Sequence, residues 1–468
     1  MIKFGTGGWR AVIGDEFIKS NITSLAQAIA DEVIEMKREN EGIVIGYDRR
    51  FLSDFAAKWV AEVLAGNGVT VHFIDRIAPT PLVMYGVKTL KTPYGMAITA
   101  SHNPAEYNGI KVFTEGGKDA DIEVTREFEK RIEHGLSVRS IPFEEGIKKG
   151  IIKIADLYNS YIDSIIGMID MEAIRNAHMR ILLDPMFGVS RTALQTVLMT
   201  ARCDVDIIND RHDTLFGGRL PSPSAHTLEK LSAMVVEDGY DLGIGTDGDA
   251  DRIGIIDEKG RFIHPNEVML LLYYYLLKYK GWRGDVVRNV ATTCILDKVA
   301  EDFGQKCHEV PVGFKHISSM MEKTDALLGG ESSGGLTIRG HIRGKDGIFA
   351  SSLLVEMICV TGKHLSDMLA EIYEKYGYMQ MSEFDTKFSA EKKEEIRRVL
   401  YEEEKIPDFG IEVERVSRAD GVKIRFKDGG WIIGRFSGTE PLIRIFCEMD
   451  SKERADEMIE KMRAFLKI

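Results

Sequence analysis

Three aspartates at alternate positions stand in the segment Thr246-Asp-Gly-Asp-Ala-Asp-Arg252. Their carboxylates can converge on one hard cation, because the small residues between them let the loop curl. Three like charges packed together without a cation would repel one another, which favours a metal site over a solvated acidic turn. An EF-hand competes, since Glu258 stands where its last ligand would be, but Arg252 occupies the position that needs glycine. Asp247, Asp249 and Asp251 are therefore predicted to hold Mg²⁺.

The segment Thr99-Ala-Ser-His-Asn-Pro104 places a serine directly after a short apolar run. Small residues at a strand end expose the Ser101 hydroxyl, and Asn-Pro breaks the chain after it. Ser101 is a candidate nucleophile or phosphate carrier, and His102 is a candidate acid or base. The segment alone is also compatible with an ordinary turn. Because adjacent residues point apart, Ser101 and His102 are not a ready-made dyad.

An anion cradle is predicted near the C-terminus, in the segment Arg435-Phe-Ser-Gly-Thr-Glu-Pro-Leu-Ile-Arg444. Two arginines offer fork-shaped donors, and hydroxyl and backbone N–H groups complete the site. The alternative is an exposed turn with a salt bridge to Glu440. The predicted phosphate-binding residues are Arg435, Ser437, Gly438, Thr439 and Arg444.

The segment Gly329-Gly-Glu-Ser-Ser-Gly-Gly335 is a polar loop after a short apolar run. It could read sugar hydroxyls or be a simple surface turn. Further cationic candidates for substrate binding follow or precede it: Lys315, His341, Arg343 and Lys345. The glycine loop that ends at Arg10 is a weak signal by itself. Other basic residues either line the entrance of the site or lie on the surface, and the surface is the favoured interpretation: Lys3, Arg49, Arg50 and Arg219.

The elements that must position these loops alternate along the chain. An amphipathic helix over 22–37 precedes a short apolar strand from Ile43, and the same alternation returns around 180–246 and 285–330. This pattern predicts α/β units with mixed, mostly parallel sheets in a three-fold internal repeat, whose loops bind ligands at the carboxyl ends of strands. The tail differs and predicts a smaller α+β domain. The predicted domains are 1–150, 151–256, 257–377 and 378–468.

Composition excludes several classes of protein. The formal charge is −12, from 61 basic and 73 acidic residues, which argues against nucleic acid or an anionic membrane as the main partner. The longest apolar run, Val268 to Leu277, is too short to span a bilayer and predicts a buried helix. The five cysteines are scattered and include no CxxC pair, so a reduced, cytoplasmic protein is expected.

Together these segments resemble the α-D-phosphohexomutase superfamily, in the same order and over the whole chain. The resemblance rests on the serine, aspartate, sugar and phosphate loops, supported by Gly5-Thr-Gly-Gly-Trp-Arg10 and Tyr107-Asn-Gly-Ile-Lys111. It implies three related α/β/α domains and a smaller fourth domain around a central cleft. By position, Ser101 would be the phosphoserine and would complete the Mg²⁺ site. The implied cationic and acid–base residues are Arg10, His102, Lys111 and Arg252, and the implied sugar readers are Glu331 and Ser333.

The resemblance also implies a reaction. Such an enzyme moves a phosphoryl group between C1 and C6 of a hexose through a hexose 1,6-bisphosphate that turns around while bound. Phosphoglucosamine mutases usually carry glutamine where Ser332 stands and histidine where Gly335 stands. Glucose phosphate is therefore the first expected substrate, mannose phosphate the second and glucosamine phosphate the third. A Mg²⁺-dependent sugar-phosphate phosphatase and a non-catalytic sugar-phosphate binding protein are the alternatives. The sequence does not indicate an oligomeric state.

Overall fold

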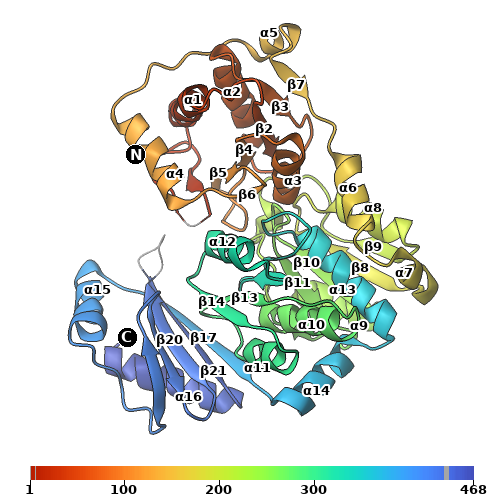
Figure 1. The fold of residues 1–468 in the computed structure, drawn as a ribbon, viewed down its shortest axis with the longest axis vertical. Helices are drawn as coiled ribbons and strands as arrows, with labels where there is room; N and C mark the ends of the chain where they lie inside the picture. The colour runs from red at the N-terminus through yellow and green to blue at the C-terminus, as the bar shows by residue number, and fades with distance from the viewer. Residues whose placement is uncertain (1, 6, 437–441) are drawn as a thin grey trace.

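The computed structural model describes residues 2–5, 7–436 and 442–468, which form four sheets. The first domain, at the top of Figure 1, contains a sheet in the order β1-β5-β4-β2-β3-β7, with β6 paired to β5. Its strands are β1 (Trp9–Val12), β2 (Ile43–Tyr47), β3 (Val71–Phe73), β4 (Tyr94–Ile98), β5 (Tyr107–Thr114), β6 (Lys118–Asp119) and β7 (Ile152–Ile154). Its helices are α1 (Lys19–Glu35), α2 (Ser53–Gly66), α3 (Thr80–Leu90), α4 (Ile122–Glu133) and α5 (Phe143–Lys148).

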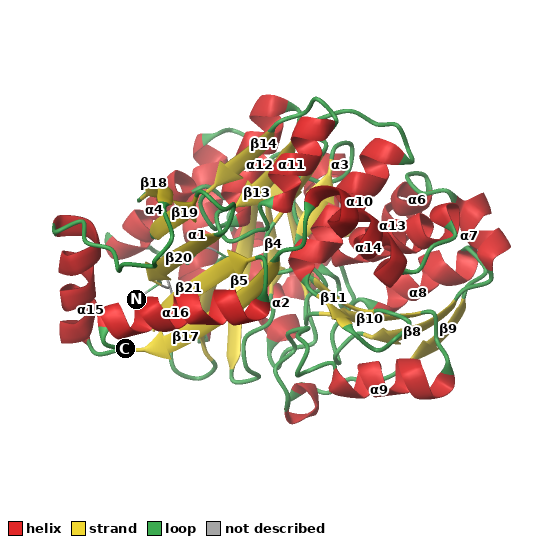
Figure 2. Cartoon of the chain, turned by 90° about the horizontal axis from the view of Figure 1, so that it is seen from below, coloured by secondary structure: helices red, strands yellow, loops and turns green. Residues whose placement is uncertain are grey.

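The second sheet has the order β12-β11-β10-β8-β9. Its strands are β8 (Arg180–Asp184), β9 (Asp204–Ile207), β10 (Leu242–Thr246), β11 (Ile253–Ile256) and β12 (Phe262–Ile263). The helices of this part of the chain are α6 (Tyr158–Ile166), α7 (Met171–Ala177), α8 (Arg191–Thr200), a 3₁₀ turn (Phe216–Gly218) and α9 (Glu229–Asp238). In Figure 2, α9 covers one face of this sheet, while α8 lies on the other.

The third sheet has the order β14-β13-β15-β16. Its strands are β13 (Val286–Asn289), β14 (Cys307–Val310), β15 (Leu328–Gly330) and β16 (Leu336–Ile338). The surrounding helices are α10 (Pro265–Lys278), α11 (Ile295–Asp302), α12 (Phe314–Thr324), α13 (Gly347–Thr361) and α14 (Leu365–Tyr376).

The first three sheets repeat one topology. Each contains a central strand, a parallel neighbour on each side, and an antiparallel strand outside one neighbour: β3-β2-β4-β5, β9-β8-β10-β11 and β14-β13-β15-β16. This confirms the predicted repeat of an α/β unit. The serine, aspartate and sugar loops follow the third strand of each unit: β4, β10 and β15. The sequence did not predict the short strands β3, β9 and β14, because they have no strong apolar signal.

The fourth domain, at the lower left of Figure 1, contains an antiparallel sheet in the order β17-β21-β20-β19-β18. Its strands are β17 (Gln380–Lys387), β18 (Val413–Ser417), β19 (Val422–Phe426), β20 (Trp431–Phe436) and β21 (Leu442–Met449). Helix α16 (Lys452–Leu466) packs on β17 and β21, and α15 (Ala390–Arg397) runs into a turn of π-helix (Arg398–Glu402). This is the expected small α+β domain.

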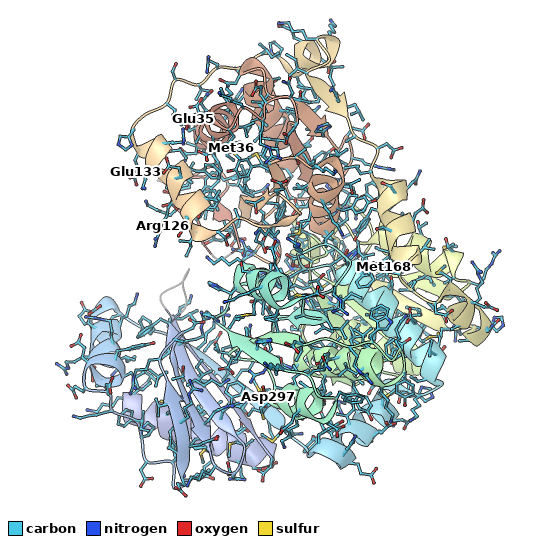
Figure 3. All side chains as sticks on the ribbon, in the orientation of Figure 1. Glu35, Met36, Arg126, Glu133, Met168 and Asp297 are labelled. Atoms are coloured by element: carbon cyan, nitrogen blue, oxygen red, sulfur yellow. The ribbon has the colours of Figure 1, made fainter. Side chains whose placement is uncertain are left out.

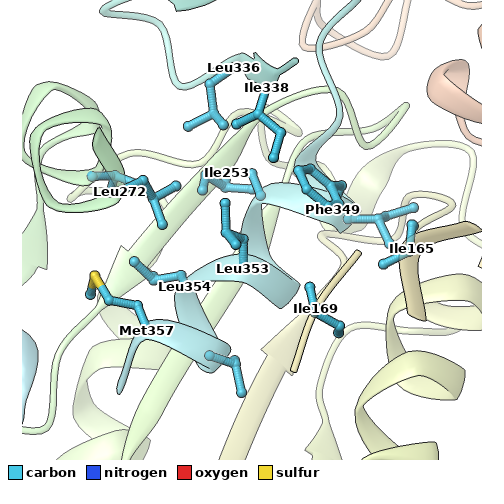
Figure 4. Close-up of a cluster of buried hydrophobic side chains, with 14 of the residues drawn as sticks. Ile165, Ile169, Ile253, Leu272, Leu336, Ile338, Phe349, Leu353, Leu354 and Met357 are labelled. Carbon is cyan, nitrogen blue, oxygen red and sulfur yellow. The ribbon is translucent and has the colours of Figure 1, made fainter. Parts of the chain in front are cut away.

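Two helices form the centre of the core shared by the second and third domains. The run Val268 to Leu277 lies in α10 and is buried, as its composition predicted. Helix α13 has no polar stripe in its first eleven residues, which are all buried. Figure 4 shows α13 side chains, among them Phe349 and Leu353, in one buried cluster with Ile165 of α6 and Leu336 of β16. An all-round apolar helix is stable in such a position.

The first sheet ends at Ile154 and the second at Ile263, whereas the sequence placed the boundaries at 150 and 256; the exact boundaries stay a prediction. Every cysteine is a free thiol. Among the described residues, no single helix is long and apolar enough to cross a membrane.

Candidate functional site

The serine loop begins at the end of β4, in the middle of the first sheet. Ser101 is wholly buried and has a left-handed backbone, with φ of 53°. The Thr99 hydroxyl accepts a hydrogen bond from the Ser101 N–H at 2.8 Å and donates one to Asp48 at 2.6 Å. The Ser101 Oγ donates to Asp247 Oδ2 at 2.7 Å. Two loops that are far apart in the chain therefore meet at one hydroxyl.

The aspartate loop turns between the antiparallel strands β10 and β11, and all three carboxylates are buried. Asp247 Oδ1 accepts from the N–H groups of Asp251 and Arg252 at 3.0 and 3.1 Å. Asp249 Oδ1 and Asp251 Oδ1 are buried with no hydrogen-bond partner among the described residues. One oxygen from each carboxylate lies within 4.8 Å of the others. Unsatisfied buried oxygens of a hard donor set fit a Mg²⁺ ion, which would supply the missing partner.

Two lysines from different domains face this cluster. Lys111 Nζ, on β5, lies 2.6 Å from both Asp249 Oδ2 and Asp251 Oδ2, and Lys345 Nζ lies 3.1 Å from Asp251 Oδ2. Burial alone would lower the pKa of Lys111, but the aspartates outweigh it and raise that pKa. Burial would raise the pKa of Asp251, and Lys111 with Lys345 instead holds it well below its usual range. Both groups are therefore charged at neutral pH.

The pKa of Asp247 shifts the other way. Burial raises it well above its usual range, and the neighbouring Asp249 and Asp251 raise it further. A carboxyl in this position is stabilised as an anion when a cation binds to the cluster.

Arg10, His102 and Arg252 surround the serine. Arg10 Nη1 donates to Asn103 Oδ1 at 2.6 Å, and Arg252 Nε lies 3.8 Å from Asp251 Oδ1. His102 Nδ1 lies 3.5 Å from Ser101 Oγ, which is long for a hydrogen bond. Arg252, then burial, then Arg10 lower the pKa of His102 well below its usual value. The imidazole is therefore neutral at pH 7 and able to accept a proton.

The predicted sugar loop follows β15. Glu331 is buried, and its Oε1 accepts from the Gly313 N–H at 2.9 Å, whereas Ser333 is exposed. Lys315, on α12, shares a small cavity with Lys111 and Asp119 of the first domain.

His341 and Arg343 do not join the group. The ring of His341 is buried, lies 2.7 Å from Asp346 Oδ2 and stacks on Phe349. Arg343 Nη1 bonds Glu322 at 2.5 Å on the surface. Among the cationic residues predicted in this segment, Lys345 faces the cluster, while His341 supports α13 and Arg343 makes a surface ion pair. The sequence could not separate them because all three have donors.

The predicted phosphate cradle is partly described. Arg435 on β20 and Arg444 on β21 are directly opposite each other in the register. Arg435 Nη2 lies 3.2 Å from Asp420 Oδ1, and Arg444 Nε lies 3.6 Å from Asp385 Oδ2. Ser437, Gly438 and Thr439 lie outside the described residues. Opposed like charges are unfavourable across a strand pair unless anions balance them, and Asp420 and Asp385 do so here. The phosphate site stays a prediction.

Sequence reasoning missed three residues that contact these loops. Thr80 Oγ1 donates to Asp249 Oδ2 at 2.5 Å, and Asp48 accepts from Thr99. The prediction that Arg50 is a surface residue is wrong, because its side chain has 0% exposure and bonds the Ser101 carbonyl. The Asp48-Arg49-Arg50 loop follows the central strand of the first unit, so its place in the repeat was the available signal.

Comparisons with known proteins agree along the whole chain. Residues 1–139, 159–260, 264–376 and 386–465 match, in turn, the phosphoglucomutase/phosphomannomutase α/β/α domains I, II and III and the C-terminal domain. A phosphoglucomutase/phosphomannomutase of Thermococcus kodakarensis is 30% identical, with 98% of this chain and 96% of that protein covered. A phosphoglucosamine/phosphogalactosamine mutase of Sulfurisphaera tokodaii is 30% identical, with 98% of each covered. The crystal structure of an inferred phosphomannomutase from Thermus thermophilus superimposes with a TM-score of 0.86 at 29% identity, covering 100% of this chain and 99% of that one.

Proposed function

The chain belongs to the phosphoglucomutase/phosphomannomutase family and is a phosphohexomutase, and from that premise we propose that it interconverts glucose 1-phosphate and glucose 6-phosphate through a phosphoserine at Ser101 and glucose 1,6-bisphosphate. The observation that carries the proposal is the Ser101 hydroxyl, 2.7 Å from a buried carboxylate of the aspartate cluster. A phosphatase would not need a serine carrier at this position.

In the proposed reaction, phosphoserine 101 gives its phosphoryl group to a hydroxyl of the bound hexose monophosphate. The bond between phosphorus and Ser101 Oγ breaks as the bond to the sugar oxygen forms. The neutral imidazole of His102 accepts the hydroxyl proton and passes a proton to Ser101 Oγ, 3.5 Å away, as that oxygen leaves. The resulting bisphosphate turns around, and its other phosphoryl group returns to Ser101 by the reverse steps.

The remaining residues position the substrate and balance charge. Asp247, Asp249 and Asp251 would hold Mg²⁺, which neutralises charge on phosphoryl oxygens when bound. Lys111, Arg10 and Arg252 offset the charge of the transferring group, because phosphoryl transfer depends mainly on positioning and electrostatics. Arg435 and Arg444 bind the phosphate that is not reacting, together with Ser437, Gly438 and Thr439. Lys315, Lys345, Glu331 and Ser333 contact the sugar phosphate between the two ends.

The sugar preference is argued from the loop around Gly335. A Cβ built on Gly335 would lie 2.1 Å from Cδ of Lys345, so the lysine occupies the space that a histidine at 335 would need. That histidine is usual in phosphoglucosamine mutases. This departure from the phosphoglucosamine mutase pattern supports a hexose phosphate without the amino group, and we place glucose phosphate first and mannose phosphate second. Relatives named for several sugars make direct competition the appropriate test.

The first experiment incubates the purified protein with glucose 1-phosphate, Mg²⁺ and a trace of glucose 1,6-bisphosphate. A coupled dehydrogenase follows glucose 6-phosphate, and mannose and glucosamine 1-phosphates are compared by kcat/KM. We expect Mg²⁺-dependent turnover that falls at least about a thousandfold in Ser101→Ala, because the carrier is lost. Ser352→Ala is the control, since it removes a buried hydroxyl that bonds a helix carbonyl. Release of free phosphate without isomerisation would support a phosphatase instead.

A further inference from the structure

The Arg50 side chain is wholly buried against the serine loop. Its guanidinium donates to carbonyl oxygens of the same loop: Ser101 at 2.7 Å, Asn103 at 2.6 Å, Pro104 at 2.7 Å and Tyr107 at 2.9 Å. A surface arginine rarely satisfies so many backbone acceptors. The mechanism proposed above gives this side chain no part in binding or chemistry.

The loop needs such support because its backbone is unfavourable. Ser101 has a backbone φ of 53°. Residues other than glycine, asparagine and aspartate rarely adopt this left-handed region. Its carbonyl and those of the following residues converge on one point, where their partial negative charges would repel each other without a cation. A strained conformation persists when surrounding contacts over-determine it.

Asp48 completes the support from the same loop as Arg50. Its carboxylate is buried, lies 3.5 Å from Arg50 Nε and accepts from the Thr99 hydroxyl at 2.6 Å. Because Thr99 in turn accepts from the Ser101 N–H, both polar groups of the Ser101 peptide backbone are held: the N–H through Thr99 and the carbonyl by Arg50.

The second domain closes the arrangement. The Arg50 guanidinium stacks on Phe216, 4.8 Å from the ring centroid. A Cβ on Gly248, within the aspartate loop, would come 2.7 Å from the Ser101 carbonyl oxygen. The Ser101 carbonyl is thus enclosed between Arg50 and the aspartate loop, so a shift of the guanidinium would move Ser101 relative to Asp247.

We propose that Arg50 is a positioning residue, whose guanidinium gathers the carbonyls of the serine loop and thereby holds Ser101 Oγ towards the aspartate cluster. The inference rests on the proposed role of Ser101 as phosphoryl carrier. Arg50 touches no reacting atom, so its loss should lower kcat and change KM little, because substrate binding elsewhere in the site is retained.

Arg49 provides a matched control, since it is the preceding residue and also donates to backbone carbonyls. Its Nη1 bonds Asp210 O at 2.7 Å and Arg211 O at 3.2 Å, both in the second domain. Arg49→Met therefore removes comparable bonds without touching the serine loop. Arg50→Met removes the clamp, and Arg50→Lys keeps the charge but loses the fork of donors.

The test measures kcat, KM and backbone hydrogen exchange of residues 99–107 for the three variants. We expect Arg50→Met to lower kcat at least about a hundredfold, with KM within about threefold of the unaltered value. Backbone exchange in residues 99–107 should become faster. Arg50→Lys should give values between those of the unaltered protein and those of Arg50→Met. Added guanidinium should recover part of the kcat of Arg50→Met. Arg49→Met should keep kcat within about threefold and leave exchange in 99–107 unchanged.

Two outcomes would overturn the inference: unchanged exchange of 99–107 in the Arg50 variants, or equal loss of kcat in Arg49→Met and Arg50→Met. If Arg50→Met does not fold, Arg50→Lys decides by the same measurements. If the unaltered protein turned over no hexose phosphate, the proposed function would fail, while the exchange experiment would still decide whether Arg50 holds the loop.

Discussion

At the scale of single residues, the aspartate cluster is defined by its unmet hydrogen bonds. Asp249 and Asp251 each direct one oxygen to Lys111 and keep the other buried without a partner among the described residues. Lys111 and Lys345 pair with the Oδ2 atoms of these aspartates, and neither lysine meets the two remaining Oδ1 atoms. The cluster is therefore incomplete without a cation, and its electrostatic energy should respond directly to Mg²⁺.

We expect Mg²⁺ to raise the free energy of unfolding by about 3 kcal/mol at a concentration of roughly one hundred times its Kd, because it binds the folded cluster and not the unfolded chain. Asp249→Asn should abolish most of this response, since one ligand charge is lost. The measurement is thermal unfolding with and without Mg²⁺, with EDTA as reference. Asp184→Asn is the control, because Asp184 is another buried carboxylate of the second domain that bonds Met186 N and Asn209. An equal response in Asp249→Asn would contradict the assignment.

At the scale of elements, the start of α13 depends on a single carboxylate. Asp346 Oδ1 accepts from the N–H groups of Ile348 and Phe349, both at 2.9 Å. Its Oδ2 accepts from the Tyr161 hydroxyl at 2.7 Å and meets the His341 ring at the same distance. One side chain therefore caps the central helix and ties it to α6, just after Lys345 reaches the cluster.

We expect Asp346→Ala to destabilise the folded protein by about 3 kcal/mol. The change removes the helix cap and leaves the buried Tyr161 hydroxyl and His341 ring without this hydrogen-bond partner. Asp346→Asn should lose only about 1 kcal/mol, since its amide oxygen can still accept from the first turn of the helix. Urea unfolding of both variants measures the difference. Equal losses in the two variants would mean that volume, not capping, sets the stability here.

At the scale of the whole molecule, the fourth domain is held against the third by a charge network in which Lys423 and Arg288 are buried. Lys423 on β19 donates to Glu309 at 2.5 Å and to the Val290 carbonyl at 2.6 Å, and it lies 4.3 Å from the Trp431 ring centroid. Arg425 and Arg288 both bond Asp297, which Figure 3 labels on the side of α11 next to the fourth domain. The network fixes the strands that carry Arg435 and Arg444 relative to the third domain.

Lys423 gives this interface a pH dependence. Burial, and then Arg288, lower the pKa of Lys423 to about 8 against the opposing pull of Glu309. The unfolded chain, with an ordinary lysine pKa, binds more protons above pH 8, so the free energy of unfolding rises with pH from about 8 towards about 10.5.

We expect that rise to be roughly 2 kcal/mol larger in the unaltered protein than in Lys423→Met, when pH 7.5 is compared with pH 9.5. Urea unfolding at the two pH values measures it. Lys427→Met, which alters an exposed lysine just after β19 that is paired with Glu412, should behave like the unaltered protein. An identical pH response in Lys423→Met would show that this lysine keeps its ordinary titration in the fold.

Local patterns in the sequence were sufficient for the class of fold. Periodicity and composition are local properties of each segment. They predict the alternation of strands and helices in the first three domains, the buried run Val268 to Leu277 and the different C-terminal domain. The short strands β3, β9 and β14 were missed, since a few residues of mixed polarity give little periodic signal. The family was equally readable, because its motifs are short and contiguous.

The tertiary structure decided which polar atoms are satisfied and which are left over. Arg50 and Ser101 are separated by 51 positions, and Ser101 and Asp247 by 146, so no local pattern records their contact. His341 and Lys345 are four residues apart and chemically alike as donors, yet one faces Asp346 and the other faces Asp251. Residue type and spacing define what a segment can do chemically. Burial and long-range pairing determine which of those possibilities is realised, because only the packed chain excludes water and brings distant charges together.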